Sequence, residues 1–110
     1  MSATIPAPVS AYFSAVNAGK AEGVASAFAP DGEVQDERAT HRGRESISTW
    51  AADTLQRYRV QNAILSARSD ASGEAVVIAR VTGTFPGSPL DFTYRFTLDD
   101  GLVRVLEISL

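Results

Sequence analysis

The carboxylate of Asp36 is the side chain whose position best suits general base catalysis. Residues 33–37 read EVQDE, and the alternation of a short strand puts Asp36 on the same face as Val34, with the other three side chains opposite. An apolar cavity on that face would suit proton abstraction, because burial raises the pKa of carboxyl groups in general. The alternative is a structural aspartate that caps the following loop or pairs with an arginine.

Tyr12 and His41 are the other candidates for acid–base chemistry. Tyr12 lies on an apolar helical face, where a buried phenol needs a hydrogen-bond partner, either a ligand or a backbone carbonyl. His41 is the single histidine, and its predicted loop position favours exposure to solvent. Asp36 and Glu37 lie near it in sequence but point to opposite faces of a strand, so we expect no metal site.

Arg80 and the aromatic residues could contribute to a binding site. Arg80 shares a strand face with Val76 and Ile78, and a charged side chain on an apolar face has three explanations. It holds an anion, it pairs with a carboxylate such as Asp36 or Glu107, or it lies at a sheet edge. The aromatic side chains either line a pocket for a flat apolar ligand or fill the core; they are Trp50, Tyr58, Phe85, Phe92, Tyr94 and Phe96.

The composition excludes several classes of protein. With 110 residues, the chain has the size of one domain, so we expect residues 1–110 to form a single domain. The net charge of -3 argues against a nucleic acid partner, and the absence of cysteine excludes disulfides and thiolate chemistry. No apolar run reaches the roughly 18 residues of a membrane span, and no signal peptide is evident. We expect a cytoplasmic protein without membrane partners.

The first half of the chain predicts three helices. Val9, Tyr12, Phe13 and Val16 form one helical face, and Gly19 supplies a stop. A second apolar stripe covers residues 21–28 and ends at the turn residues 30–32. A third helix is predicted from about residue 44 to 57, with apolar positions 47, 50, 51, 54 and 58 on one face. Residues 33–37 read as a short strand and residues 38–42 as a loop.

The second half predicts a meander of four strands over residues 60–67, 74–85, 90–98 and 102–110. In the third of these, leucine and aromatic side chains alternate with polar ones, which predicts one buried and one solvated face. Helices followed by a meander predict an α+β domain, with three N-terminal helices packed on one face of a strongly curved sheet and a cavity between them. The polar outer face suits contact between two copies of the chain.

Three segments carry a resemblance to a known superfamily. Residues 12–19 (YFSAVNAG) match a first helix ending in Asn-x-Gly, residues 28–36 (FAPDGEVQD) match a helix-turn-strand signature, and residues 42–50 (RGRESISTW) match the opening of a third helix. Over essentially its whole length the chain resembles the nuclear transport factor 2-like (NTF2-like) superfamily, and within it the SnoaL-like polyketide cyclase and ketosteroid isomerase branches. The resemblance implies a cystatin-like cone, in which a bent mixed or antiparallel sheet encloses a cavity, and a homodimer through the sheet's outer face.

The resemblance also implies roles for individual residues. The isomerases use an aspartate on the first strand as proton shuttle, with a first-helix tyrosine and a protonated aspartate that hold the oxyanion. Asp36 and Tyr12 take the first two positions and are the candidate catalytic residues. Phe92 stands at the third position, and Asp91, one residue away, points to the other face. The candidate ligand-binding residues are Val16, Phe28, Val34, Trp50, Tyr58, Arg80, Phe92 and Tyr94.

Three functional hypotheses follow. The first is a domain that binds a small apolar or carbonyl-containing molecule and performs isomerase or cyclase chemistry through Asp36, with no cofactor. The second is a non-catalytic ligand-binding or dimerisation module, with a pocket filled by Phe28, Trp50 and Phe92. The third is a relative of the epoxide hydrolases, in which Asp36 and Arg80 supply two of the three groups that activate water. The volume of the cavity separates the first hypothesis from the second.

Overall fold

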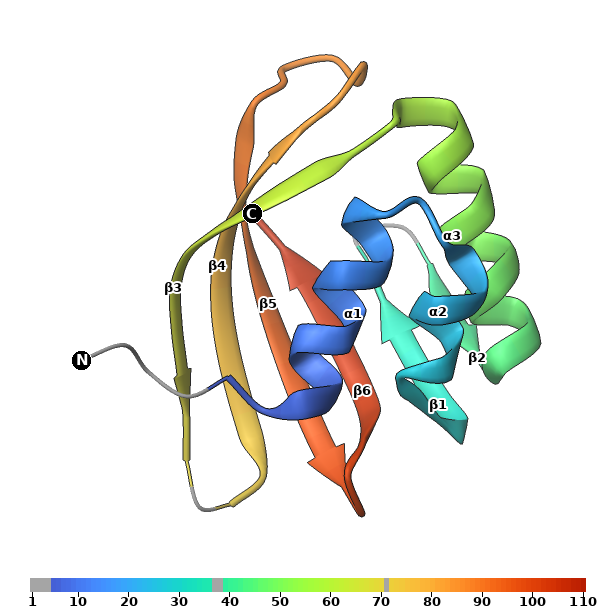
Figure 1. Cartoon of the computed structure of the whole chain (residues 1–110), viewed down its shortest axis with the longest axis vertical. Coiled ribbons are helices and arrows are strands. Elements are labelled where there is room, and N and C mark those ends of the chain that lie inside the picture. The colour runs from blue at the N-terminus through green and yellow to red at the C-terminus, as the bar shows by residue number, and fades with distance from the viewer. Residues whose placement is uncertain (1–4, 37–38, 71) are drawn as a thin grey trace.

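A six-stranded sheet that curls without closing forms the framework of the molecule (Figure 1). The computed structural model describes residues 5–36, 39–70 and 72–110. β1 and β6 are parallel, and all other neighbouring strands are antiparallel. The predicted α+β fold with a curved mixed sheet is therefore confirmed. In spatial order the strands are β2 (Thr40–Arg42), β1 (Phe28–Gln35), β6 (Leu102–Ser109), β5 (Leu90–Asp99), β4 (Glu74–Thr82) and β3 (Gln61–Ser69).

Three helices lie on one side of the curved sheet: α1 (Ala7–Asn17), α2 (Ala21–Ser26) and α3 (Arg44–Tyr58) (Figure 1). Pro8 stands in the first turn of α1, where its missing N–H costs no helical hydrogen bond, and Gly19 follows the helix with a φ of 71°. All three predicted helices are present. In the described part of the chain, no helix is long and apolar enough to cross a membrane.

β1 begins earlier than the sequence pattern predicts. The helical stripe over residues 21–28 includes Phe28, but α2 ends at Ser26 and Phe28 opens β1. Pairing with the last strand explains the difference, because Phe28 is fully buried opposite Val103, whose backbone N–H donates to the carbonyl oxygen of Ala27 over 2.9 Å. The turn residues 30–32 consequently form an irregularity within β1 instead of a helix end.

The segment predicted as a loop over residues 38–42 contains a short strand. Thr40, His41 and Arg42 form β2 and pair with residues 33–35 of β1. Glu37, at the predicted end of the strand over residues 33–37, lies outside the described residues; β1 itself ends at Gln35. Only three residues make up β2, which is too few for alternation to show in the sequence.

Aromatic side chains fix α1 on the sheet. Tyr12 and Phe13 of α1 meet Tyr94 and Phe96 of β5 in edge-to-face and tilted contacts, with ring centroids 5.1 Å apart for Phe13 and Tyr94 and 5.6 Å apart for Tyr12 and Phe96. All four side chains are at most 3% exposed. Such contacts add to the burial of apolar surface, and they hold the Tyr12 and Tyr94 rings in place.

The chain after β4 fixes the end of α3. The carbonyl oxygen of Tyr58 accepts a hydrogen bond from the backbone N–H of Thr84 over 2.8 Å, and that of Arg57 accepts from the Thr84 hydroxyl over 3.2 Å. A Cβ at Gly83 would lie 2.6 Å from the Tyr58 carbonyl oxygen, so only glycine allows this approach. β4 therefore ends at Thr82 and does not continue to residue 85 as the pattern predicts.

Candidate functional site

A cavity of about 580 Å³ lies between the helices and the sheet. Its walls come from all three helices, from the connection between β1 and β2, and from residues of the other strands, including Val81 of β4 and Ile108 of β6. The volume falls within the roughly 300–1,000 Å³ that is typical of small-molecule sites. Trp50 and Phe92 line this space and leave it open, in contrast to the filled interior expected for the second hypothesis.

Most of the predicted site residues meet at this cavity. Phe28 and Val34 do not line it: both are fully buried in the core on β1, so neither is placed to touch a ligand. The predicted site residues that do line the cavity are Tyr12, Val16, Asp36, Trp50, Tyr58, Phe92 and Tyr94.

Arg80 lies on the outer face of the sheet and does not line the cavity. The buried positions of β4 are Val77, Ala79 and Val81, so the alternating side chains, including that of Arg80, point outward. Its guanidinium forms an ion pair with Asp91 of β5, with 2.9 Å between Nε and Oδ1, and not with Asp36 or Glu107. The epoxide hydrolase hypothesis therefore loses its arginine, and Asp91 faces away from the cavity as the strand offset predicts.

Asp36 lies directly after β1 and lines the cavity, and its carboxylate accepts two kinds of hydrogen bond, one from the backbone and one from a side chain of the cavity wall. The backbone N–H of Ala39, just before β2, donates to Oδ1 over 3.0 Å. The indole N–H of Trp50 donates to Oδ2 over 3.1 Å. The side chain remains 30% exposed. Asp36 therefore combines the two alternatives that the sequence left open, because it caps a loop and also lines the cavity.

His41 is less exposed than its predicted loop position suggests. It lies on β2, its side chain is 25% exposed, and its Nε2 is 4.0 Å from Oδ2 of Asp36. The imidazole packs beside the indole of Trp50, with 5.8 Å between ring centroids. The pairing of β2 with β1 explains the difference, since it turns His41 toward α3. Within the described ranges, no three His, Cys, Asp or Glu side chains come close enough to hold a metal ion.

Two buried phenols face the cavity from α1 and β5. Burial, with a smaller contribution from the neighbouring Tyr94, raises the pKa of the Tyr12 hydroxyl well above its ordinary value. Burial also raises the pKa of Tyr94, although a hydrogen bond from Asn62 opposes the shift. Both hydroxyls are therefore protonated at neutral pH and can donate a hydrogen bond.

Asn62 is a cavity residue that the sequence pattern does not reveal. Its Nδ2 donates to the Tyr94 hydroxyl over 3.4 Å. The side chain of Asn17, at the end of α1, bonds both backbone groups of Asn62: Oδ1 accepts from its N–H over 2.7 Å and Nδ2 donates to its carbonyl oxygen over 3.0 Å. The Asn-x-Gly motif at residues 17–19 points to Asn17 at the end of a helix, but nothing in the sequence indicates that Asn17 bonds Asn62 on β3.

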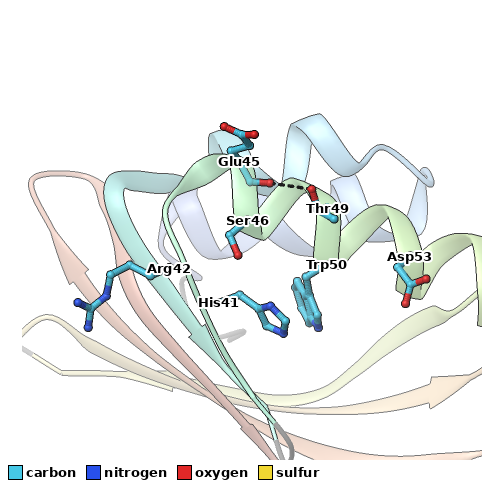
Figure 2. Close-up of a pocket in the computed structure, with 7 residues that line it drawn as sticks. All are labelled: His41, Arg42, Glu45, Ser46, Thr49, Trp50 and Asp53. Carbon is cyan, nitrogen blue, oxygen red and sulfur yellow. Dashed lines mark hydrogen bonds between the residues drawn. The ribbon is translucent and has the colours of Figure 1, made fainter.

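A second, shallower hollow lies on the other side of Trp50 and His41 (Figure 2). Its volume is about 660 Å³, and α3 and β2 form its walls. Figure 2 shows the two rings below α3, the Glu45 side chain above the helix, and the Arg42 side chain directed away from the others. His41, Trp50 and Asp53 border both this hollow and the cavity, so the imidazole and the indole lie between the two spaces.

The fold and the cavity together define an NTF2-like, cystatin-like α+β protein with an internal pocket. The sequence profile of the SnoaL-like domain matches residues 9–106, so the chain belongs to the SnoaL-like domain family. No curated protein matches the chain.

Solved structures agree with this assignment. A proposed polyketide cyclase from Sinorhizobium meliloti is 36% identical, with a TM-score of 0.90 over 96% of this chain and 95% of that one. A protein with a ketosteroid isomerase-like fold from Catenulispora acidiphila, solved with trimethylamine, is 24% identical, with a TM-score of 0.85 over 97% and 87%. A cystatin-fold protein from Novosphingobium aromaticivorans is 18% identical, with a TM-score of 0.80 over 94% and 95%.

Proposed function

We propose that this chain binds a small apolar or carbonyl-containing molecule in its cavity and catalyses a proton transfer on it. The observation that carries the proposal is the presence of a carboxylate, Asp36, and a buried phenol, Tyr12, on the walls of one cavity of about 580 Å³. The other walls are mainly apolar and aromatic, as expected for a site that binds an uncharged organic molecule. The 36% identity to a proposed polyketide cyclase supports the same class of chemistry.

In the proposed reaction, Asp36 removes a proton from the carbon next to the ligand's carbonyl group. The C–H electron pair moves into the carbonyl group and forms an enolate, whose oxygen accepts a hydrogen bond from Tyr12. The raised pKa of Tyr12 keeps that phenol protonated as a donor. In a ligand with a C=C bond next to the deprotonated carbon, the enolate is conjugated with that bond, and return of the proton from Asp36 to the far carbon of the bond completes an isomerisation. In a ligand with a second carbonyl group, attack of the enolate carbon on that carbonyl, whose oxygen then takes the proton, completes a cyclisation.

An exchange experiment with 2-tetralone, a bicyclic ketone with acidic α-protons, tests the proposal. In D2O the wild-type protein should accelerate the loss of α-proton NMR signals, and Asp36→Asn should lose about 100-fold or more of that acceleration. Asp99→Asn is the matched control, because Asp99 is an exposed carboxylate that pairs with Arg104 at the end of β5. Equal exchange by wild type and Asp36→Asn would overturn the assignment of Asp36 as base.

A non-catalytic ligand-binding module is the second candidate. It is favoured by the hydrogen bonds that the Asp36 carboxylate accepts from Ala39 and Trp50, since they give the carboxylate a structural role. This alternative predicts that 2-tetralone raises the melting temperature of wild type and Asp36→Asn alike, without any acceleration of exchange in either. Thermal shift and exchange, measured on the same samples, therefore separate the two candidates.

We also propose a two-fold homodimer formed through the outer face of the sheet. Cross-strand neighbours on this face alternate in charge, with Arg80 beside Asp91 and Arg95 beside Glu107. Ile78 adds an apolar side chain that is 39% exposed. A two-fold axis brings one patch against its own copy, so a patch with both charges and an apolar centre is self-complementary.

Sedimentation equilibrium tests the dimer. The wild-type chain should sediment at twice its mass of 11.7 kDa, and Ile78→Asp should shift it toward the monomer. Ile64→Asp is the matched control: Ile64 is also 39% exposed, but it lies opposite the buried Ala79 and so on the other face of the sheet. A monomeric wild type, or equal dissociation by both variants, would contradict this interface.

A further inference from the structure

We propose that Asn62 and Tyr94 form a subsite for a hydroxyl group, so that the ligand of this cavity is a hydroxylated apolar molecule. The inference rests on the proposed function only in taking the cavity as a ligand site, and it does not depend on catalysis by Asp36. The starting observation is Oδ1 of Asn62, a buried side-chain oxygen with no hydrogen-bond partner among the described residues.

A buried acceptor without a partner is costly, and native proteins satisfy almost all such atoms. Asn62 lines the cavity, and its cross-strand neighbour Val81 lines it as well, so the Asn62 side chain faces the ligand space. A ligand that donates a hydrogen bond to Oδ1 would remove the cost, whereas a ligand without a donor would leave the oxygen unpaired. The cavity therefore favours molecules that carry an O–H or N–H group near Asn62.

Tyr94 narrows the choice to a hydroxyl group. Its oxygen accepts a hydrogen bond from Nδ2 of Asn62 over 3.4 Å, and this leaves its own O–H proton to donate. The raised pKa of Tyr94 keeps that proton in place. The subsite thus offers an acceptor, Oδ1 of Asn62, next to a donor, the hydroxyl of Tyr94. A hydroxyl group both donates and accepts, and so fits this pair, whereas an ammonium group only donates and a carboxylate only accepts.

The protein holds the subsite rigidly. Asn17 bonds the N–H and the carbonyl group of Asn62 over 2.7 and 3.0 Å, and the Gln61 side chain donates to the backbone carbonyl oxygen of Asn17 over 3.1 Å. These contacts tie the start of β3 to the end of α1. Phe13 packs against the Tyr94 ring at 5.1 Å between centroids. Because both partners are held before binding, little conformational freedom is lost when a hydroxyl group joins them.

A matched series of ligands tests the subsite: 2-tetralone, 6-hydroxy-2-tetralone and 6-fluoro-2-tetralone, with dissociation constants measured by isothermal titration calorimetry. Fluorine is close to a hydroxyl group in size but cannot donate a hydrogen bond. Wild type should bind the hydroxyl compound about tenfold more tightly than the other two. Asn62→Leu removes the acceptor at similar volume and should abolish this preference, whereas Asn62→Asp keeps an acceptor oxygen and should retain a preference for the hydroxyl compound.

The outcomes separate this inference from the proposed function. Equal affinity of wild type for all three compounds overturns the subsite but leaves the cavity as a ligand site. An undiminished preference in Asn62→Leu overturns the role of Asn62. Binding of none of the three at millimolar concentration contradicts both the subsite and the proposed function. If Asn62→Leu fails to fold, the comparison of the hydroxyl and fluoro compounds on wild type and Asn62→Asp decides the question.

Discussion

The hydrogen bond between Trp50 and Asp36 should contribute measurably to the stability of the fold. The indole N–H donates to Oδ2 over 3.1 Å, and it links the middle of α3 to the residue that follows β1. Hydrogen bonds to charged groups contribute about 1.5–3 kcal/mol. Because the Asp36 side chain is 30% exposed, water competes for the carboxylate, and we expect about 1–2 kcal/mol.

A double-mutant cycle isolates this contribution. Trp50→Phe removes the indole N–H together with some apolar contact, and Asp36→Ala removes the carboxylate together with the cap on the Ala39 N–H. The losses that do not involve the pair occur in both arms of the cycle and cancel. The coupling energy that remains should be about 1–2 kcal/mol. It can be measured by urea unfolding followed by circular dichroism, since Trp50 is the only tryptophan and its fluorescence is lost in the variants.

The same cycle between Trp50 and Asp53 serves as the control. Asp53 lies one turn further along α3, but its carboxylate pairs with Arg57 over 3.2 Å. Its coupling to Trp50 should be near zero. A coupling between Trp50 and Asp36 within about 0.3 kcal/mol of zero would refute the argument, because it would mean that water replaces the indole N–H without loss.

Two further predictions concern stability. Gly83→Ala should lower the free energy of unfolding by about 1–3 kcal/mol, because its Cβ would lie 2.6 Å from the Tyr58 carbonyl oxygen; an unchanged urea midpoint would contradict the contact. Since the folded-state pKa values of Tyr12 and Tyr94 lie above the ordinary value of 10.0, the folded state keeps protons that the unfolded chain loses, and stability should fall as pH rises above about 10. Tyr94→Phe should flatten this decline in urea midpoints between pH 8 and 11, and an unaltered slope would refute its cause.

The elements with strong periodicity were predictable from the sequence, and those formed by distant pairing were not. The apolar face of α3 and the alternation in β5 appear directly in their residues, and both elements are present. Phe28 fits a helical stripe just as well as a strand, and only its pairing with Val103 at the far end of the chain decides between them. Local patterns carry no information on such partners.

Only part of the candidate site was predictable from the sequence. Strand alternation and the resemblance to the NTF2-like superfamily single out Asp36 and Tyr12, and both residues line the cavity. Alternation alone does not say which face of β4 is buried, and Arg80 shows the consequence, because it lies with Val76 and Ile78 on the outer face. Asn62 was missed since its importance depends on contacts with Asn17, 45 residues earlier, and with Tyr94, 32 residues later.

The parallel pairing of β1 with β6 has a consequence for biosynthesis. During translation β1 emerges before β6, because Val103, which lies opposite Phe28, comes 75 residues (103 minus 28) later in the chain. Ribosomes add about 5–20 residues per second, so for several seconds β1 can pair with β2 but not with β6, and its apolar start at Phe28 lacks a partner strand. The cavity wall that includes Ile108 is completed later still. We therefore expect nascent chains of this protein to bind chaperones until β6 has left the exit tunnel.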